Sequence, residues 1–265
     1  MHPLLLCLAA GPLLAGSGEA RAQEGVPQEL SAALGEAGLW IDLERGVLAV
    51  PVEVQIREDL LEYLLVGPGG AAHESLFLTR VRPSLVNAAL LLLGVEPGHN
   101  AFVEEKAGAT DGPPKREIHA PSGDGFYLYA AWREGDDTYF FRVEDLVANL
   151  ATGRTLRRHR WVYLGSRFAA LEKGQPEKFV ADLEGNLINL SFFYQGNTLL
   201  TAALDECVEQ TIWAANAWLV PARGEPVCLL FARQPLAALD PAWEARLPVG
   251  KPHPATDPAD EEPPR

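Results

Sequence analysis

The chain has 265 residues, of which 48% are hydrophobic and 22% are charged. These proportions are typical of a globular protein and exclude collagen-like, coiled-coil and wholly disordered chains. Asp and Glu (36) outnumber Lys and Arg (22), so the net charge is −14. This acidic balance argues against general nucleic-acid binding, which requires a positively charged surface. The length is sufficient for one large domain or two small ones.

The first 22 residues predict a secretory signal peptide. An apolar run at residues 4–15 is about half as long as a membrane-spanning helix. Ala20, Arg21 and Ala22 then form a small-residue cleavage site. No Lys or Arg precedes the run, and a buried N-terminal helix is the alternative. We expect cleavage after Ala22, a mature chain that begins at Gln23 without a membrane span, and a periplasmic or secreted protein.

One helix stands out in the first half of the chain, at residues 83–93. Pro83 suits the first helical position, where its missing N–H costs nothing, and Gly94 suits the left-handed position after the helix end. The residues from Pro83 to Leu93 are apolar nearly all round, which predicts a helix buried on several sides. The segment before the first strand, residues 23–38, is polar and is expected to be flexible.

Most of the remaining sequence predicts short strands separated by Gly, Asn and Asp turns. We expect hairpins at 39–54, 126–143, 179–193 and 213–232, further strands at 60–66 and 160–165, and a short helix at 144–150. The proline-rich acidic tail, residues 249–265, is expected to be disordered.

These elements predict an α+β fold. In it, a mostly antiparallel sheet packs on or around the one buried apolar helix from Pro83 to Leu93, and a β-sandwich is the alternative. We expect one domain over residues 39–248.

The predicted mature chain keeps two cysteines, Cys207 and Cys228. An even number in an exported protein permits a disulfide. If residues 213–232 form a hairpin, however, Cys228 faces Leu219 rather than Cys207, so two separately buried thiols are an equally open alternative. Two cysteines cannot alone hold a four-cysteine zinc or iron–sulfur site, and we expect no cofactor.

The candidate catalytic residues are His73, Glu74, Ser75 and Asp182. A histidine beside a carboxylate suits acid–base chemistry, and Ser75 adds a nucleophile. Neighbouring residues in a strand point to opposite faces, so hydrogen bonds to the backbone near the helix are the alternative for His73 and Glu74. Asp182 and Asn186 belong to a segment with the oxygen ligands of a partial calcium loop, but a hairpin turn explains it without metal, and we expect no metal site.

The candidate binding residues are Ser166, Asn186 and an arginine-rich segment. Ser166 follows Gly165 without a complete G-x-S-x-G motif and suits a turn or cap. Residues 151–170 contain five arginines and no acid. Arg157, Arg158 and Arg160 of this segment suit a carboxylate or phosphate ligand, and pairing with neighbouring acids is the alternative. A histidine site would require His73, His99 and His119 to converge.

Several stretches resemble the YdjY-domain family. They are residues 61–65, residues 73–77 with His73, Glu74 and Ser75, and the Leu-rich stretch 83–98, followed in order by 161–166, 181–186 and 226–230. The resemblance covers residues 39–234. It implies an exported bacterial protein from a family of uncharacterised function, with no catalytic set to transfer. Some relatives carry ferredoxin-type cysteine motifs, which this chain lacks.

The leading functional hypothesis is a non-enzymatic ligand- or protein-binding module of the cell envelope. Its expected partner is an envelope protein or a small anionic ligand. A hydrolase-type enzyme that uses His73 and Glu74 is one alternative. An accessory subunit of an envelope redox system is another, and it depends on the resemblance alone.

Overall fold

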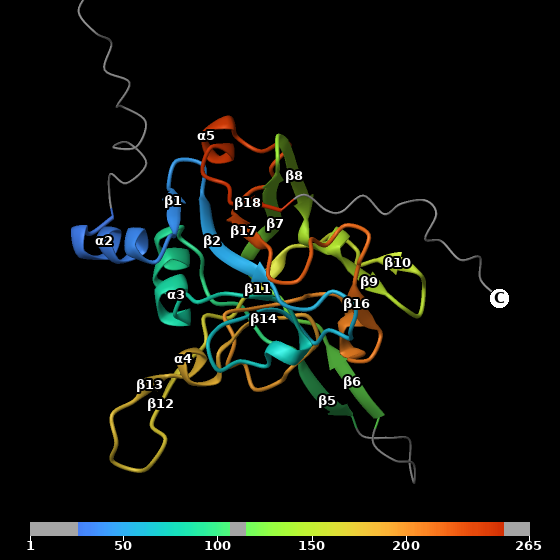
Figure 1. Cartoon of the computed structure of the whole chain (residues 1–265). Coiled ribbons are helices and arrows are strands. Elements are labelled where there is room, and N and C mark those ends of the chain that lie inside the picture. Colours follow the sequence, from blue (N-terminus) through green and yellow to red (C-terminus); the bar gives the residue numbers. More distant parts are fainter. Residues whose placement is uncertain (1–25, 107–114, 252–265) are drawn as a thin grey trace, which may run out of the picture.

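The computed structural model describes residues 26–106 and 115–251, and its centre is a closed eight-stranded barrel (Figure 1). The barrel strands, in spatial order, are β2 (Val47–Val54), β17 (Pro226–Ala232), β7 (Gly125–Glu134), β11 (Trp161–Tyr163), β15 (Leu200–Thr201), β14 (Asn186–Asn189), β3 (Tyr63–Val66) and β4 (Ser75–Leu78). β4 pairs with β2 and closes the ring. The neighbours are antiparallel except for β14–β15 and β3–β4.

This architecture contradicts the predicted fold class. The chain is not an α+β sheet packed on a buried helix, and the β-sandwich alternative is wrong as well. The alternation of apolar residues correctly indicates strands with a buried face, but it carries no information on whether the first and last strands of a sheet meet.

The other elements surround the barrel. The additional strands are β1 (Trp40–Asp42), β5 (Phe102–Lys106), β6 (Lys115–His119), β8 (Asp137–Arg142), β9 (Val147–Asn149), β10 (Arg154–Thr155), β12 (Phe168–Ala169), β13 (Lys178–Phe179), β16 (Trp213–Ala215) and β18 (Val249–Gly250). The helices are α2 (Gln28–Glu36), α3 (Pro83–Leu92), α4 (Val180–Glu184) and α5 (Pro241–Glu244), with 3-10 turns η1 (Ala72–Glu74), η2 (Val143–Leu146) and η3 (Asp205–Val208).

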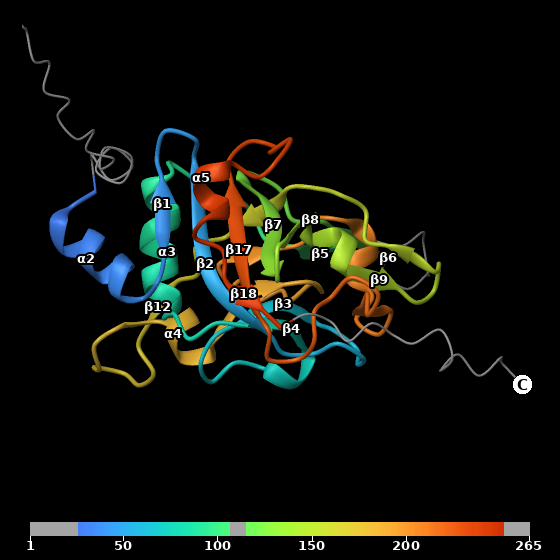
Figure 2. The ribbon, with the colours of Figure 1, turned by 45° about the horizontal axis from the view of Figure 1, so that its top comes forward.

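Two apolar clusters follow from the alternation of side chains along the strands. On β17, Val227, Leu229 and Phe231 belong to the main core, to which all eight barrel strands contribute. Cys228 and Leu230, on the opposite face, belong to a smaller cluster that Trp243 of α5 covers. α5 lies beside β17 in both views of the ribbon (Figures 1 and 2).

The predicted helix is confirmed as α3, but its surroundings differ from the prediction. Gly94 has φ +70° and ends the helix as expected. Val86 and Leu90 are buried, whereas Leu91 is 49% exposed. α3 lies on the flank of the barrel beside β1 and β2 (Figure 2), so it buries one side rather than several.

Two of the four predicted hairpins are confirmed, at β1–β2 and at β7–β8. The hairpin expected at 179–193 is wrong because α4 occupies its first half. Gly185, with φ +71°, follows the helix end rather than forming a hairpin turn. The pairing expected within 213–232 is also wrong: β16 pairs with β9, whereas β17 pairs with β2 and β7.

The short helix expected at 144–150 is the 3-10 turn η2 followed by β9. The segment expected to be flexible, 23–38, contains α2, whose Leu34 is fully buried. β18 lies in the first residues of the expected tail, where it pairs with β7.

The predicted signal peptide and residues 252–265 lie outside the described residues. Within the described ranges, no helix is long and apolar enough to cross a membrane.

The two cysteines are free thiols. Cys207 lies in the main core and Cys228 in the smaller cluster. The structure therefore has two separately buried thiols rather than a disulfide. Burial raises the pKa of both thiols to about 12. Neither thiol is poised as a nucleophile at neutral pH.

Asp182 of α4 caps α3. Its Oδ1 accepts a hydrogen bond of 2.7 Å from the backbone N–H of Ser84 in the first turn of α3. Arg82, the residue before that helix, provides no side-chain cap of its own, and its guanidinium lies 3.7 Å from Asp182. A carboxylate from a neighbouring helix therefore satisfies one of the free N–H groups of α3.

A buried charged cluster joins β8, η2 and β11. Glu144 is fully buried and accepts two hydrogen bonds from Arg142, at 2.6 and 3.0 Å, and one of 3.1 Å from the indole of Trp161. The side chain of His159 is 8% exposed and its Nδ1 lies 3.0 Å from the carbonyl of Arg157. His159 Nε2 is buried without a hydrogen-bond partner among the described residues.

The first prediction concerns the cap. We expect Asp182→Ala to lower the free energy of unfolding by about 1 kcal/mol, the typical cost of losing a helix cap. Asp182→Asn retains an acceptor oxygen and should lose less. Urea unfolding followed by circular dichroism measures the difference. The control is Glu177→Ala, which removes an exposed carboxylate before β13, and an equal loss there would contradict the capping role.

The second prediction concerns pH. Burial lowers the pKa of His159, and Arg142 and Arg157 lower it further, against the opposing effect of Glu144. As pH falls below the ordinary histidine value of 6.5, the unfolded chain takes up a proton that the folded protein resists. The free energy of unfolding should therefore be highest above pH 7 and fall towards pH 5.5, by at most about 1.4 kcal/mol per pH unit.

His159→Asn retains a donor near the Nδ1 position and removes the titrating group, so the loss of stability between pH 7.5 and 5.5 should shrink. His73→Gln is the matched control, because that side chain is 80% exposed. An unchanged pH dependence in His159→Asn would contradict the assignment.

Candidate functional site

Both candidate serines use their hydroxyl groups within the fold. Ser75 is fully buried, and its Oγ donates to the carbonyl of Phe77 at 2.8 Å. Ser166 has φ +55°; its Oγ donates to the carbonyl of Asn197 at 2.7 Å and accepts from Ala181 N–H at 3.1 Å. Ser166 thus joins three segments as a turn residue, and both hydroxyls donate to backbone carbonyls.

His73 and Glu74 lie in η1 at the protein surface. Their nearest charged atoms are 3.7 Å apart, and the His73 side chain is 80% exposed. Asp182 is engaged with the first turn of α3 and does not line the cavity that contains His73. The structure therefore does not gather His73, Ser75 and Asp182 into a catalytic constellation.

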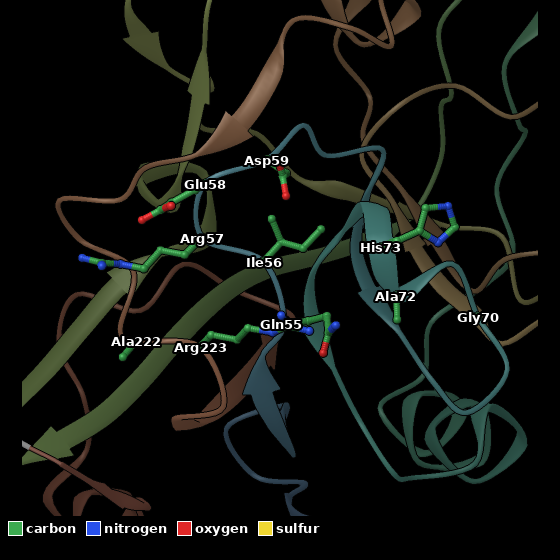
Figure 3. A pocket seen from close by; sticks show the side chains of 10 residues that line it. All are labelled: Gln55, Ile56, Arg57, Glu58, Asp59, Gly70, Ala72, His73, Ala222 and Arg223. Carbon is green, nitrogen blue, oxygen red and sulfur yellow. The ribbon is translucent and has the colours of Figure 1, made fainter.

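His73 lines a cavity of about 740 Å³. It lies at the barrel end where β2 ends and β4 and β17 begin. Its lining residues are Gln55, Ile56, Arg57, Glu58, Asp59, Gly70, Ala72, His73, Ala222 and Arg223 (Figure 3). In that view, the imidazole of His73 points away from Glu58 and Asp59. We call this space the His73 cavity.

The charged groups of the His73 cavity are mostly in contact with solvent. Glu58, Asp59 and Arg223 are exposed. Arg57 is held by the carbonyls of Ala217 and Val220, at 2.7 and 3.2 Å. Water satisfies exposed charges, so the empty cavity carries no large desolvation penalty that a ligand would relieve.

A second cavity, of about 310 Å³, has a different lining. Its residues are Tyr63, Glu184, Asn186, Asn189, Phe193, Gln195, Gly196, Asn197 and Thr198. Four of these are carboxamides, which offer both hydrogen-bond donors and acceptors. We call this space the amide cavity.

Part of the lining of the amide cavity is fixed by internal hydrogen bonds. Asn186 Oδ1 accepts from Ala71 N–H at 3.1 Å, and Asn197 Nδ2 donates to Glu184 at 2.6 Å. Thr198 Oγ1 donates to the carbonyl of Leu187 at 2.7 Å. These contacts hold the wall of the cavity in one conformation.

The other polar groups of the amide cavity are uncommitted. Asn189 is only 4% exposed, and its Oδ1 is buried without a hydrogen-bond partner in the described part of the chain. Burial raises the pKa of Tyr63 to about 12, so its hydroxyl keeps its proton. The ring of Tyr63 stacks on Phe193, with centroids 5.0 Å apart. A buried amide, a neutral hydroxyl and an aromatic pair therefore line one small space.

The three candidate arginines have separate partners. Arg157 contacts Glu206 at 3.1 Å, and Arg158 binds Asp145 with two hydrogen bonds, at 2.8 and 3.2 Å. Arg160 donates to the carbonyl of Gly123 at 2.7 Å. The segment is thus a series of ion pairs and backbone contacts rather than one convergent anion site.

Among the described residues, His73, His99 and His119 do not form a group at metal-ligand distance. His119 lies beside Glu104 and Glu117 on the β5–β6 hairpin, with one ligand atom of each within 4.8 Å of the others. Lys106 contacts both carboxylates, and its ammonium group offsets part of their negative charge. Lys106 also holds the pKa of Glu117 below its usual value. The lysine already occupies the cation position of this group.

Asn189, Tyr63, Phe193 and Gln195 were not among the residues predicted from sequence. One signal was present: four carboxamides, including Asn186, lie within residues 186–197. Their spacing matches no motif, and only the folded chain brings them to Tyr63, which is opposite Asn189 in the β14–β3 pair.

Comparison with known proteins gives one match. The family model described as the YdjY domain matches residues 39–232. No curated protein and no solved structure matches the chain. The matched residues include all eight barrel strands and the whole lining of both cavities. The chain therefore belongs to the YdjY-domain family.

Proposed function

We propose that this chain is a non-enzymatic binding module of the cell envelope and that its ligand occupies the amide cavity. The observation that carries the proposal is the unpartnered Oδ1 of Asn189. A buried polar group without a hydrogen bond costs about 1–3 kcal/mol. Asn189 lines the cavity, so a ligand that donates to this oxygen after a rotation of the amide would recover that free energy, and water leaving the cavity would add to it.

The amide cavity is preferred over the larger His73 cavity for an energetic reason. Glu58, Asp59 and Arg223 are exposed to water, whereas Asn189 and Tyr63 are 4% and 8% exposed. Desolvated polar groups discriminate between ligands more strongly than hydrated ones. The larger volume of the His73 cavity therefore does not make it the preferred binding site.

Binding is also preferred over hydrolysis. The hydroxyls of Ser75 and Ser166 are both engaged with the backbone, and Asp182 is engaged with Ser84. A hydrolase would need a nucleophile or an activated water next to a base. His73 and Glu74 have exposed side chains and no such neighbour among the described residues.

The third prediction tests the role of Asn189. Asn189→Leu replaces an amide whose Oδ1 is buried without a partner among the described residues with an apolar side chain of similar size. We expect the free energy of unfolding of the ligand-free protein to stay unchanged or to rise by about 1 kcal/mol. Urea unfolding of the purified mature chain measures this.

Asn149→Leu is the matched control. Asn149 is 5% exposed and also ends a short strand, but its Oδ1 accepts from Ala151 and Thr152 N–H at 3.0 and 3.2 Å. This variant should lose about 1–3 kcal/mol. A comparable loss in Asn189→Leu would mean that Asn189 serves the fold, and the proposed site would be wrong.

The fourth prediction concerns export. The signal peptide predicted at residues 1–22 is the basis for placing the module in the envelope. On expression of the full chain in a Gram-negative host, we expect recovery from the periplasmic fraction with Gln23 as the first residue, read by N-terminal sequencing. A chain without residues 1–22 should stay in the cytoplasm. Cytoplasmic full-length protein that retains the first 22 residues would contradict export.

A further inference from the structure

We propose that the ligand of the amide cavity is a neutral polyhydroxylated ring of monosaccharide size. This inference rests on the proposed function, because it names the ligand class of the same site. Three properties of the cavity lead to it: its charge, its hydrogen-bonding groups and its aromatic surface.

The charge of the cavity argues against an ionic ligand. None of the described residues that line it is Lys, Arg or His. The one lining carboxylate, Glu184, already accepts a hydrogen bond of 2.6 Å from Asn197 Nδ2, while Arg167 donates to Asn197 Oδ1 at 2.9 Å. The amide of Asn197 thus bridges the negative charge of Glu184 and the positive charge of Arg167. An anion would meet no free cation in the lining, and burying an unpaired charge is costly.

The uncommitted hydrogen-bonding groups include both donors and acceptors. Asn189 Oδ1 is an acceptor, and the protonated hydroxyl of Tyr63 offers a donor. The Oδ1 of Asn186 accepts from Ala71 N–H, which leaves the Nδ2 of this lining residue as its remaining donor. The amide of Gln195 offers both. Neighbouring hydroxyl groups on a ring, each a donor and an acceptor, match such a set better than a carboxylate or an ammonium.

The aromatic surface explains why a ring is preferred over a linear polyol. Tyr63 and Phe193 are stacked with an interplanar angle of 7° and line the cavity beside the amides. The backbone of Phe193 is held by Asn100 Nδ2 at 2.8 Å. A sugar ring presents C–H groups on one face and hydroxyls at its edge, so it can meet an apolar aromatic wall and polar amides together.

The volume sets the size of the ligand. About 310 Å³ is at the lower end of the roughly 300–1,000 Å³ range of small-molecule sites. A space of this volume accommodates one ring. A longer saccharide would have to extend past Gln195, which is exposed at the margin.

The fifth prediction is tested with the mature chain, residues 23–265, by saturation-transfer difference NMR. The probes are D-glucose, D-galactose and N-acetyl-D-glucosamine at about 10 mM, a concentration that detects millimolar dissociation constants. Acetate and glycine betaine are the anionic and quaternary ammonium probes. We expect transfer to at least one sugar and to neither ionic probe.

Variants then place the binding. Asn189→Leu should weaken sugar binding at least about tenfold, and Tyr63→Phe, which keeps the ring stack, should weaken it about threefold or more. Asp59→Asn, in the His73 cavity, should bind like the parent protein. Equal binding by Asn189→Leu would overturn the inference, because the sugar would then lie elsewhere.

The two proposals fail in different ways. The ligand class is wrong if no sugar binds, or if betaine or acetate binds in place of sugars. The binding module still stands in that case, provided that Asn189→Leu is as stable as the parent protein without ligand. If Asn189→Leu is destabilised like Asn149→Leu, both proposals are wrong.

Discussion

Phe77 and Leu78 of β4 pair with the end of β2 and thereby join the first and last strands of the eight-stranded sheet. Without this pairing, β2 and β4 would each present an open edge to solvent or to another chain. With it, side chains from all eight strands pack into one core. The same pairing brings the segment after β2 next to η1, which creates the His73 cavity.

The pairing of β3 with β14 determines where the amide cavity forms. β3 lies between β4 and β14, and this places Tyr63 opposite Asn189. The register of β14 and β3 is irregular at this point, so side chains there do not follow strict alternation. The amide cavity thus lies beside an irregular stretch of the β14–β3 pair.

Some buried polar residues of this chain form hydrogen bonds that stabilise the fold, and others have no hydrogen-bond partner among the described residues. Ser75, Ser166 and Asp182 complete hydrogen bonds of strands, turns and a helix end. Glu144 neutralises Arg142 inside the structure. The Oδ1 of Asn189 has no partner in the described residues, and the same is true of His159 Nε2 and Ser191 Oγ. Asn189 in addition lines the amide cavity. This position is the physical basis for proposing Asn189, rather than His73 or the two serines, as a binding residue.

Local features were predictable and distant pairings were not. The start and end of α3 follow from Pro83 and Gly94, and the β1–β2 and β7–β8 hairpins follow from alternation around short turns, because neighbouring residues determine these conformations. Gly185 illustrates the limit. A positive φ suits both a hairpin turn and a helix end, and the sequence alone did not distinguish them.

The sequence by itself determined the family, the β-rich second half and the apolar helix α3. Only the tertiary structure decided that the sheet closes, that Asp182 caps a helix at Ser84, and that Asn189 meets Tyr63. These contacts join residues far apart in the chain. Their formation depends on strand order and register, which the packing of the whole core selects and which no local spacing of residues records.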